Sequence, residues 1–486
     1  MQRTMKLITS KEILPLLLLV IFTFAALALP TKIAIVLTGI IFVIFSLLKP
    51  FESLLYLLIY VAVRPYLIEI NPGLKLIGDI ITFTLLIRIL WTYKFNLKHL
   101  LSFKWFELAF FAFLLFGSVI GWVNGVGIMA IIFQVRTFII MYFVYYFISR
   151  SKLPSNWASK FLWTGVALGW LLSIHGLIEK ISLRQWLLPE YWKYMPLSAE
   201  NMVRIYGLSG NPNSLALLMM FSIIAVIVLK LNDSTKQYTK LLNSSFVLFV
   251  GILILTFSRG TLIAAAALAI VYILLSKQFV LIKNLVIGSL AAFLLIYLPV
   301  NGAVKFVQTM GVEAPQGTVG TLKDRFGQTF EDKNIERMTS NGRVFYLKKG
   351  FEIWKDYPIT GSGFGTFGGA ATISYGSPLY QKYGIDLSIY FENKIYSDNQ
   401  YIQIITETGS IGVILFAAFL LGMLALFVKT RKSRFSQFMI ALWLSTCISG
   451  MFYNIWELKV YTLIFFMILG IYAVHQQWYK HTLPTK

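Results

Sequence analysis

Four short polar segments interrupt a mostly apolar sequence, and the first of them carries an arginine beside a helix start. Arg204 lies within Met202–Gly207, and the segment continues into Ser209–Ser214. Asn211 followed by Pro212 is typical of an N-cap and a first helical position. A loop arginine next to a capped helix is the structural alternative to a binding role, and both interpretations stay open for this segment alone.

Two further arginines lie in or beside apolar runs. Arg259 lies in the turn Phe257-Ser258-Arg259-Gly260 between two such runs, and Arg136 lies in the middle of another. The planar guanidinium of arginine binds phosphate oxygens bidentately, so Arg259 is a candidate for anion recognition. Its alternative is snorkelling toward lipid headgroups. An arginine in mid-membrane is costly and usually functional, and its alternative here is a structural ion pair with Asp79.

The fourth group of polar residues lies in a long segment of mixed composition. It comprises Asn341-Gly342-Arg343, then Asp356–Gly365, then Ser397–Tyr401 with Asp398, and finally Glu407–Gly412. The Gly-x-Gly-x-Gly run within it superficially suggests a nucleotide loop. We reject that function because the run lacks the strand-to-helix context and the Lys-Ser/Thr pair of a phosphate-binding loop.

The elements that must position these residues are those of an α-helical membrane protein. Of the 486 residues 57% are hydrophobic and only 13% are charged, with a mean hydropathy of +0.73. A soluble domain carries about 25% charged residues. Apolar runs long enough to cross about 30 Å of hydrocarbon recur along the chain. We predict an all-α, polytopic bundle of about 14 transmembrane helices, over 13–29, 33–49, 53–69, 76–92, 105–123, 127–149, 161–179, 213–230, 241–258, 260–276, 281–299, 408–428, 435–453 and 459–476.

Loop charge predicts the orientation of this bundle in its membrane. With the N-terminus inside, the cytoplasmic loops include 94–104 and 429–434, which are rich in Lys and Arg, whereas the short outer loop 124–126 has no charge. This asymmetry obeys the positive-inside rule and puts both termini in the cytoplasm. The same asymmetry accounts for the net charge of +22, so we expect no nucleic-acid partner. The first run ends in Ala26-Leu27-Ala28, and cleavage as a signal peptide is the alternative to a permanent anchor.

The cysteine and histidine content predicts neither a disulfide framework nor a metal site. Cys447 is the single cysteine, and the four histidines form no His-x-x-x-His pair. These counts exclude an internal disulfide and a cysteine-based metal centre. We therefore expect no metal and no cofactor.

The predicted spans divide the chain into three parts. Residues 1–299 form an N-terminal transmembrane bundle, 300–407 a large extracytoplasmic loop, and 408–486 a C-terminal three-helix segment. All four polar groups then reach the outer face. Several arginines beside a carboxylate suit a membrane-anchored substrate with a phosphate group. The arginines would stabilise a diphosphate leaving group, and the carboxylate would take a proton from an attacking hydroxyl.

The order of these motifs resembles the O-antigen ligase and polymerase superfamily. The resemblance rests on the arginine loop with Asn211-Pro212-Asn213, on Ser258-Arg259-Gly260, and on elements of the long loop over residues of roughly 200–430. Those elements are Gly-Arg, Asp-Tyr-Pro-x-x-Gly-x-Gly-x-Gly and Asp-Asn-x-Tyr followed by Glu-x-Gly-x-x-Gly. Outside this range, the spans agree with the family only in general layout.

The resemblance implies an inverting, metal-independent glycosyltransferase whose donor is an undecaprenyl-diphosphate-linked glycan. Carried over, Arg204 and Arg259 bind the diphosphate with assistance from Arg343, and Asp398 is the catalytic base. Arg136 is counted with the diphosphate-binding residues. Family ligases have histidine where this chain has Asp398, and they have twelve spans, so twelve is the alternative count here. The aspartate weakens the assignment to ligases proper. The overall look resembles polymerases of Gram-positive cell-wall polysaccharides in the bacterial plasma membrane, and teichuronic acid polymerase is the nearest suggestion.

Several alternatives stay open from the sequence. A ligase would transfer the glycan to another acceptor, a lipid-linked oligosaccharide flippase would move it across the membrane, and a scaffold would need neither Arg259 nor Asp398. Glu392, Glu407 and His175 are other candidate bases, although a packed histidine is the favoured interpretation of His175. The expected partners are the lipid-linked glycan and membrane lipids, with a chain-length regulator or a flippase as a candidate protein partner.

Overall fold

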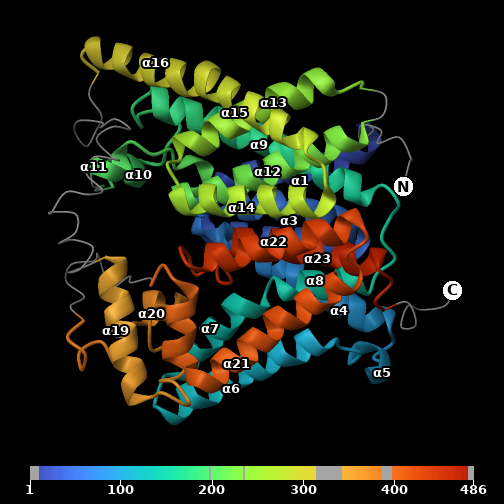
Figure 1. The fold of residues 1–486 in the computed structure, drawn as a ribbon, viewed down its shortest axis with the longest axis vertical. Helices are drawn as coiled ribbons and strands as arrows, with labels where there is room; N and C mark the ends of the chain where they lie inside the picture. Colours follow the sequence, from blue (N-terminus) through green and yellow to red (C-terminus); the bar gives the residue numbers. More distant parts are fainter. Residues whose placement is uncertain are drawn as a thin grey trace.

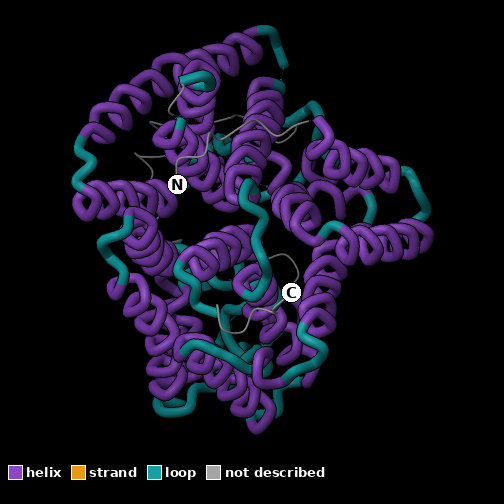
Figure 2. The backbone as a smooth tube through the Cα atoms, turned by 90° about the vertical axis from the view of Figure 1, so that its right-hand side faces the viewer, coloured by secondary structure: helices purple, strands orange, loops and turns teal. Residues whose placement is uncertain are grey.

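A computed structural model describes residues 10–195, 197, 199–233, 236–312, 342–385 and 397–479. Within these ranges every regular element is a helix, as the tube in Figure 2 shows. The prediction of an all-α protein is therefore confirmed for the part of the chain that is described.

The helices occur where the apolar runs predict them. In chain order they are α1 (Ser10–Leu27), α2 (Thr31–Leu48), α3 (Pro50–Ile70), η1 (Pro72–Leu76), α4 (Ile77–Thr92), α5 (Leu97–Leu100), α6 (Trp105–Val123), α7 (Ile128–Ile139), α8 (Tyr142–Ser149), α9 (Trp157–Ile181), α10 (Glu190–Tyr194), α11 (Ala199–Met202), η2 (Gly207–Ser209), α12 (Pro212–Asn232), α13 (Thr239–Leu255), α14 (Arg259–Ser276), α15 (Val280–Ala292), η3 (Phe293–Tyr297), α16 (Leu298–Thr309), α19 (Arg343–Asp356), α20 (Ala370–Tyr375), α21 (Gln400–Lys429), α22 (Arg434–Gly450) and α23 (Lys459–His475).

These helices form a multi-pass membrane protein. Eight described helices are long and apolar enough to cross a membrane, or nine if α7 and α8, bent by 43°, form one span. Shorter apolar helices lie at several of the other predicted positions. The total of fourteen spans therefore stays a prediction, although each predicted span overlaps a helix.

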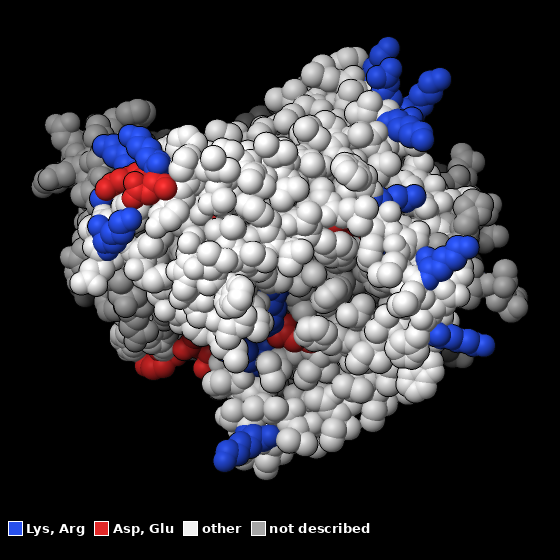
Figure 3. Space-filling view, turned by 90° about the horizontal axis from the view of Figure 1, so that it is seen from below, with Lys and Arg blue, Asp and Glu red and all other residues white. Residues whose placement is uncertain are grey.

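The surface of the bundle is the kind that lipid covers. Large apolar side chains such as Phe24, Leu115 and Leu295 are well exposed, which a water-soluble surface of this extent would not tolerate. The face in Figure 3 is largely without charge across its middle, and Lys and Arg gather along its right-hand edge. Charge is thus kept near the ends of the helices, where headgroups and water are available.

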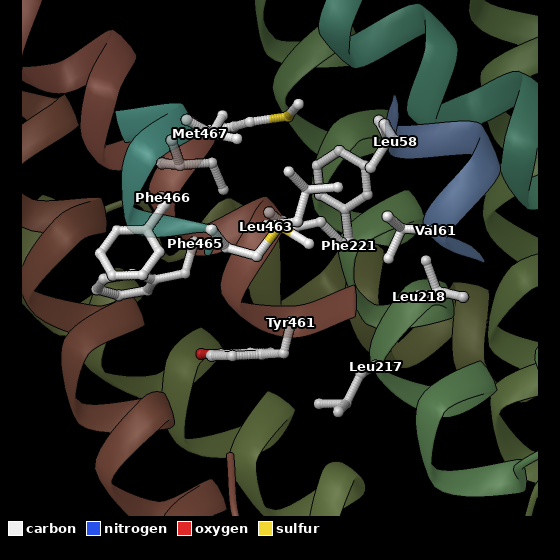
Figure 4. Close-up of a cluster of buried hydrophobic side chains, with 14 of the residues drawn as sticks. Leu58, Val61, Leu217, Leu218, Phe221, Tyr461, Leu463, Phe465, Phe466 and Met467 are labelled. Carbon is white, nitrogen blue, oxygen red and sulfur yellow. The ribbon is translucent and has the colours of Figure 1, made fainter. Parts of the chain in front are cut away.

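The centre of the bundle is packed from three helices that are distant in sequence. Figure 4 shows Leu58 and Val61 of α3 facing Leu217, Leu218 and Phe221 of α12, with the apolar side chains of α23 beside them. These side chains are largely buried and belong to one continuous hydrophobic cluster. Both α3 and α12 therefore hold α23 in place, which positions the turn that leads into α23.

The two ends of the bundle differ in what they carry. In Figure 1 α5 lies at one end, and α10, α11, α19 and α20 lie at the other. Helix α21 reaches this second end and is broken at Gly409, whose φ of 57° and ψ of −163° are not helical. The predicted span 408–428 corresponds to the part after the break. The part before it belongs to the polar end of the molecule.

The glycine-rich run of the long loop packs against α6 and α21 at this end. Gly363 has a φ of 97°, and a Cβ there would lie 2.2 Å from Gly121 Cα. The amides of Gly365, Thr366 and Phe367 donate to Glu407 Oε1 over 2.8–3.1 Å. The run therefore binds a carboxylate of the protein itself, and its glycines serve close backbone packing.

Candidate active site

The guanidinium of Arg204 is held by three oxygen acceptors from neighbouring elements. Its Nε donates to the carbonyl of Thr256 at 2.8 Å, and its Nη2 donates to Asn213 Oδ1 at 2.6 Å. A longer contact of 3.5 Å joins Nη1 to Asn201 Oδ1. As predicted, Asn211 caps α12, since its Oδ1 accepts the amides of Asn213 and Ser214. The cap fixes the start of α12 and with it the Asn213 side chain.

A buried carboxylate, Glu179, fixes the backbone that follows Arg204. Its oxygens accept the amides of Tyr206 at 3.2 Å and Gly207 at 2.6 Å, and it pairs with Arg184 at 2.7 Å. Gly207 adopts a φ of 58°, which favours glycine. Lys180 donates to the carbonyl of Val203 on the other side of Arg204. Glu179 was not predicted as a site residue. An acidic residue at the end of an apolar span could have indicated it.

A short polar network joins the turn that carries Arg259 to the loop that carries Arg204. The Ser258 hydroxyl donates to Asn213 Oδ1 at 3.0 Å and lies 2.7 Å from the Tyr453 hydroxyl. Arg259 follows as the first residue of α14, with an exposed side chain. Gly260 allows the close approach of the turn that contains Tyr453, because a Cβ would meet Phe452 at 2.8 Å. The structure thus brings the first two predicted motifs together.

Arg343, at the start of α19, and Asp398, just before α21, lie close together. Arg343 Nη2 lies 3.5 Å from Asp398 Oδ2, and both side chains are about half exposed, at 44% and 48%. Asp398 has a φ of 50°, and the next residue, Asn399, caps α21. Ser397 is tied to Asn454 by a 3.0 Å hydrogen bond. The carboxylate is therefore held between two helix starts and stays accessible.

The surroundings of Asp398 perturb its protonation. Desolvation by the surrounding protein raises the pKa of its carboxyl, while Arg343 and then Arg204 favour the charged form and limit the rise. The side chain is crowded by protein and still open on one side, which accounts for both the desolvation and the 48% exposure. Asp398 therefore lies in the field of two of the predicted arginines.

Of the other three candidate bases, two are buried and one lies outside the described residues. Glu407 is fully buried, and besides the three amides it accepts a hydrogen bond from Gln403 at 3.1 Å. No substrate hydroxyl can reach it, so Glu407 is a structural residue. His175 is buried, with Nε2 3.0 Å from the carbonyl of Leu187, as a packed histidine would be. Glu392 lies outside the described residues.

Arg136 is not part of the network around Arg204. It forms an ion pair with Asp79 at the start of α4, the pairing that was the structural alternative. Two residues away, Gln134 bonds to Glu457 at 2.5 Å and accepts the amide of Ala371 at 2.9 Å. Gln134 therefore joins α7 to the turn between α22 and α23, whereas Arg136 pairs with α4. Asn454 and Glu457 in this turn were also missed, and their signal was two polar residues between apolar spans.

The chemistry available at this site is that of cations and one accessible carboxylate. No group of three or more His, Cys, Asp or Glu side chains that could hold a metal ion occurs in the described part of the chain. Three arginines, Arg204, Arg259 and Arg343, can bind phosphate oxygens. Asp398 can accept a proton.

Comparison with known protein families supports the resemblance that the motifs indicated. Residues 244–417, about a third of the chain, match the family described as O-Antigen ligase. The matched segment contains Arg259, Arg343 and Asp398, and it leaves Arg136 and Arg204 outside. No curated protein matches the chain. The match supports a relation to the O-antigen ligase and polymerase superfamily and a glycosyltransferase-like enzyme.

Proposed function

We propose that this protein is a membrane glycan polymerase that joins undecaprenyl-diphosphate-linked repeat units on the extracytoplasmic face. Both termini lie in the cytoplasm, and the product is a cell-surface polysaccharide of the teichuronic acid or O-antigen type. The observation that carries the proposal is the placement of Asp398 in contact with Arg343 and within the field of Arg204. The match of residues 244–417 to the O-antigen ligase family supports it.

The proposed reaction is an inverting displacement at the anomeric carbon of the donor. A hydroxyl of the acceptor repeat unit attacks this carbon while the bond from the carbon to the diphosphate oxygen breaks. Asp398 takes the proton of the hydroxyl. Arg204, Arg259 and Arg343 neutralise the undecaprenyl diphosphate that leaves, which stabilises the developing charge. The products are the elongated lipid-linked glycan and undecaprenyl diphosphate.

Polysaccharide length in a deletion strain tests this function. The strain is complemented with the wild-type chain, Arg259→Ala, Asp398→Ala or the control Lys355→Ala, with protein levels matched by immunoblot. Lys355 is an exposed cation on α19, the helix that begins with Arg343, and it has no role in the proposed reaction. We expect full-length polymer with the wild type and Lys355→Ala, and single lipid-linked units on the outer leaflet with the other two variants.

Other outcomes would overturn the proposal in distinct ways. Units that accumulate on the inner leaflet would identify a flippase. Polymer that forms normally but stays on its lipid carrier, untransferred to a further acceptor, would identify a ligase. Full-length, transferred polymer in both variants would show that neither residue is catalytic.

A further inference from the structure

A second group of cations lies at the same end of the bundle and outside the candidate active site. It consists of Arg64 on α3, Lys75 in η1, Arg136 on α7 and Lys459 at the start of α23, and we refer to it as the α3–α23 basic cluster. Lys459 interacts electrostatically with Arg64, Arg136 and Lys75. Arg64 also contacts the carbonyl of Lys75 at 3.5 Å. Four elements thus converge on one cationic region.

The cluster is not balanced by acidic side chains of the protein. Asp79 pairs with Arg136, and it is the one carboxylate that forms an ion pair with these cations among the described residues. Glu457 lies nearby in sequence, but its oxygens accept hydrogen bonds from Gln134, Gln403 and the amide of Ala370. Even with Glu457 counted beside Asp79, four cations face two carboxylates, and net positive charge in a partly desolvated membrane site is costly unless an anion joins it.

The cluster is accessible from the side of the bundle. The Arg136 and Asp79 side chains are 26% and 17% exposed, so each is partly covered and partly open. Arg64 and Lys459 are likewise partly exposed, and Lys75 is exposed. A ligand could therefore reach the cluster from the lipid phase with its apolar chain still in the membrane.

The cluster also lies next to the reaction site. The turn Met451–Leu458 connects the two, since Asn454 bonds to Ser397, the residue before Asp398, and Lys459 follows the turn directly. Glu457 of the same turn bonds to Gln134, two residues from Arg136 on α7. A phosphate on the cluster would thus be held across one short turn from the catalytic carboxylate.

We propose that the α3–α23 basic cluster binds the diphosphate of the second lipid-linked substrate, the acceptor, while Arg204 and Arg259 bind that of the donor. The inference rests on the proposed polymerase function, which requires two lipid-linked molecules at once. Two cationic groups flanking one turn supply a separate anchor for each. Asp79 pairs with Arg136 and also interacts electrostatically with Lys459, and the cations in excess of its charge can bind phosphate oxygens.

Counting bound lipids tests this assignment. The full-length protein is purified in nanodiscs, incubated with undecaprenyl diphosphate, and analysed by native mass spectrometry. We expect two bound molecules for the wild type and one for the double variant Arg64→Gln, Lys459→Gln. One bound molecule is also expected for the double variant Arg204→Gln, Arg259→Gln. Each lost cation should weaken binding roughly tenfold. Arg88→Gln, at the opposite end of α4 from Asp79, is the matched control and should bind two.

The outcomes separate failure of this inference from failure of the proposed function. If the cluster variant binds two molecules and the Arg204 and Arg259 variant binds one, the cluster is not a diphosphate site and the proposed function stands. If both variants bind two, the proposed function fails as well. Phosphatidylglycerol is the competitor, and displacement of the cluster-bound molecule at equal concentration would identify a phospholipid headgroup site and overturn the proposal.

A second variant distinguishes a loss of lipid binding from a defect in folding. Asp79→Asn removes the carboxylate that pairs with Arg136 and leaves every cation in place. A binding cluster should keep two undecaprenyl diphosphate molecules in this variant, even if the thermal midpoint falls. A purely structural ion pair would instead show the same loss of stability in Asp79→Asn and in the cluster variant, with the number of bound lipids unchanged in both.

Discussion

Asn213 Oδ1 accepts hydrogen bonds from the guanidinium of Arg204 at 2.6 Å and from the hydroxyl of Ser258 at 3.0 Å. A single amide oxygen therefore joins the arginine loop to the turn that carries Arg259. Two motifs that are about 50 residues apart in sequence are in this way held as one site.

Replacing Asn213 should disconnect these motifs. Asn213→Ala removes the shared acceptor, and a hydrogen bond to a charged group contributes about 1.5–3 kcal/mol. We expect roughly a ten- to hundredfold lower rate of glycan polymerisation in isolated membranes. Asn232→Ala, at the far end of the same helix, is the control, since its side chain bonds only to the carbonyl of Val228 among the described contacts. Equal rates for both variants would contradict the linking role.

Glu179 should be needed to position Arg204. Glu179→Gln leaves Arg184 without its buried partner, and breaking such a pair costs about 3–5 kcal/mol. We expect a lower thermal unfolding midpoint in nanodiscs together with reduced polymerisation. The double variant Glu179→Gln, Arg184→Gln removes the uncompensated charge and should recover part of the midpoint. Activity should stay low in it, because the amides of Tyr206 and Gly207 still lack their carboxylate. Recovery of both properties together would argue against positioning.

The pH dependence of the reaction should report on Asp398. Because desolvation raises the pKa of its carboxyl, the proton-accepting form is lost at a higher pH than for an ordinary aspartate. Arg343 favours the charged form, so Arg343→Gln should raise the pKa further and move the acidic limb of the rate profile to higher pH. Polymerisation rates measured across pH, with Lys355→Gln as the control, check this. A uniform decrease without a shift would mean that Arg343 does not act on the base.

The glycine-rich run should be sensitive to a single methyl group at Gly363, whereas Gly376, directly after α20, should tolerate one. Gly363→Ala places a Cβ against Gly121 Cα and also strains a φ of 97°, so we expect a loss of about 2 kcal/mol or more. Gly376 has a φ of 73° with open space around it, so Gly376→Ala should show only the conformational cost of about 1 kcal/mol. The midpoints of thermal unfolding compare the two. Similar midpoints would indicate that the run does not pack closely on α6.

The sequence by itself determined the class of the protein, the positions of its helices and the local ends of several of them. Apolar length and helix caps are short-range properties, so the capping roles of Asn211 and Asn399 follow from neighbouring residues. The motifs with Arg204, Arg259, Arg343 and Asp398 could likewise be recognised along the chain, because each is a short run of residues.

Only the tertiary structure decided which of these charged residues share a site. Glu407 and Asp398 are both acidic residues of the same motif region, yet one is enclosed by backbone amides and the other is half exposed. Arg136 was grouped with the other arginines, and the structure pairs it with Asp79 of α4. Burial and ion pairing depend on how helices distant in sequence pack together, and no local pattern of residue types encodes that packing.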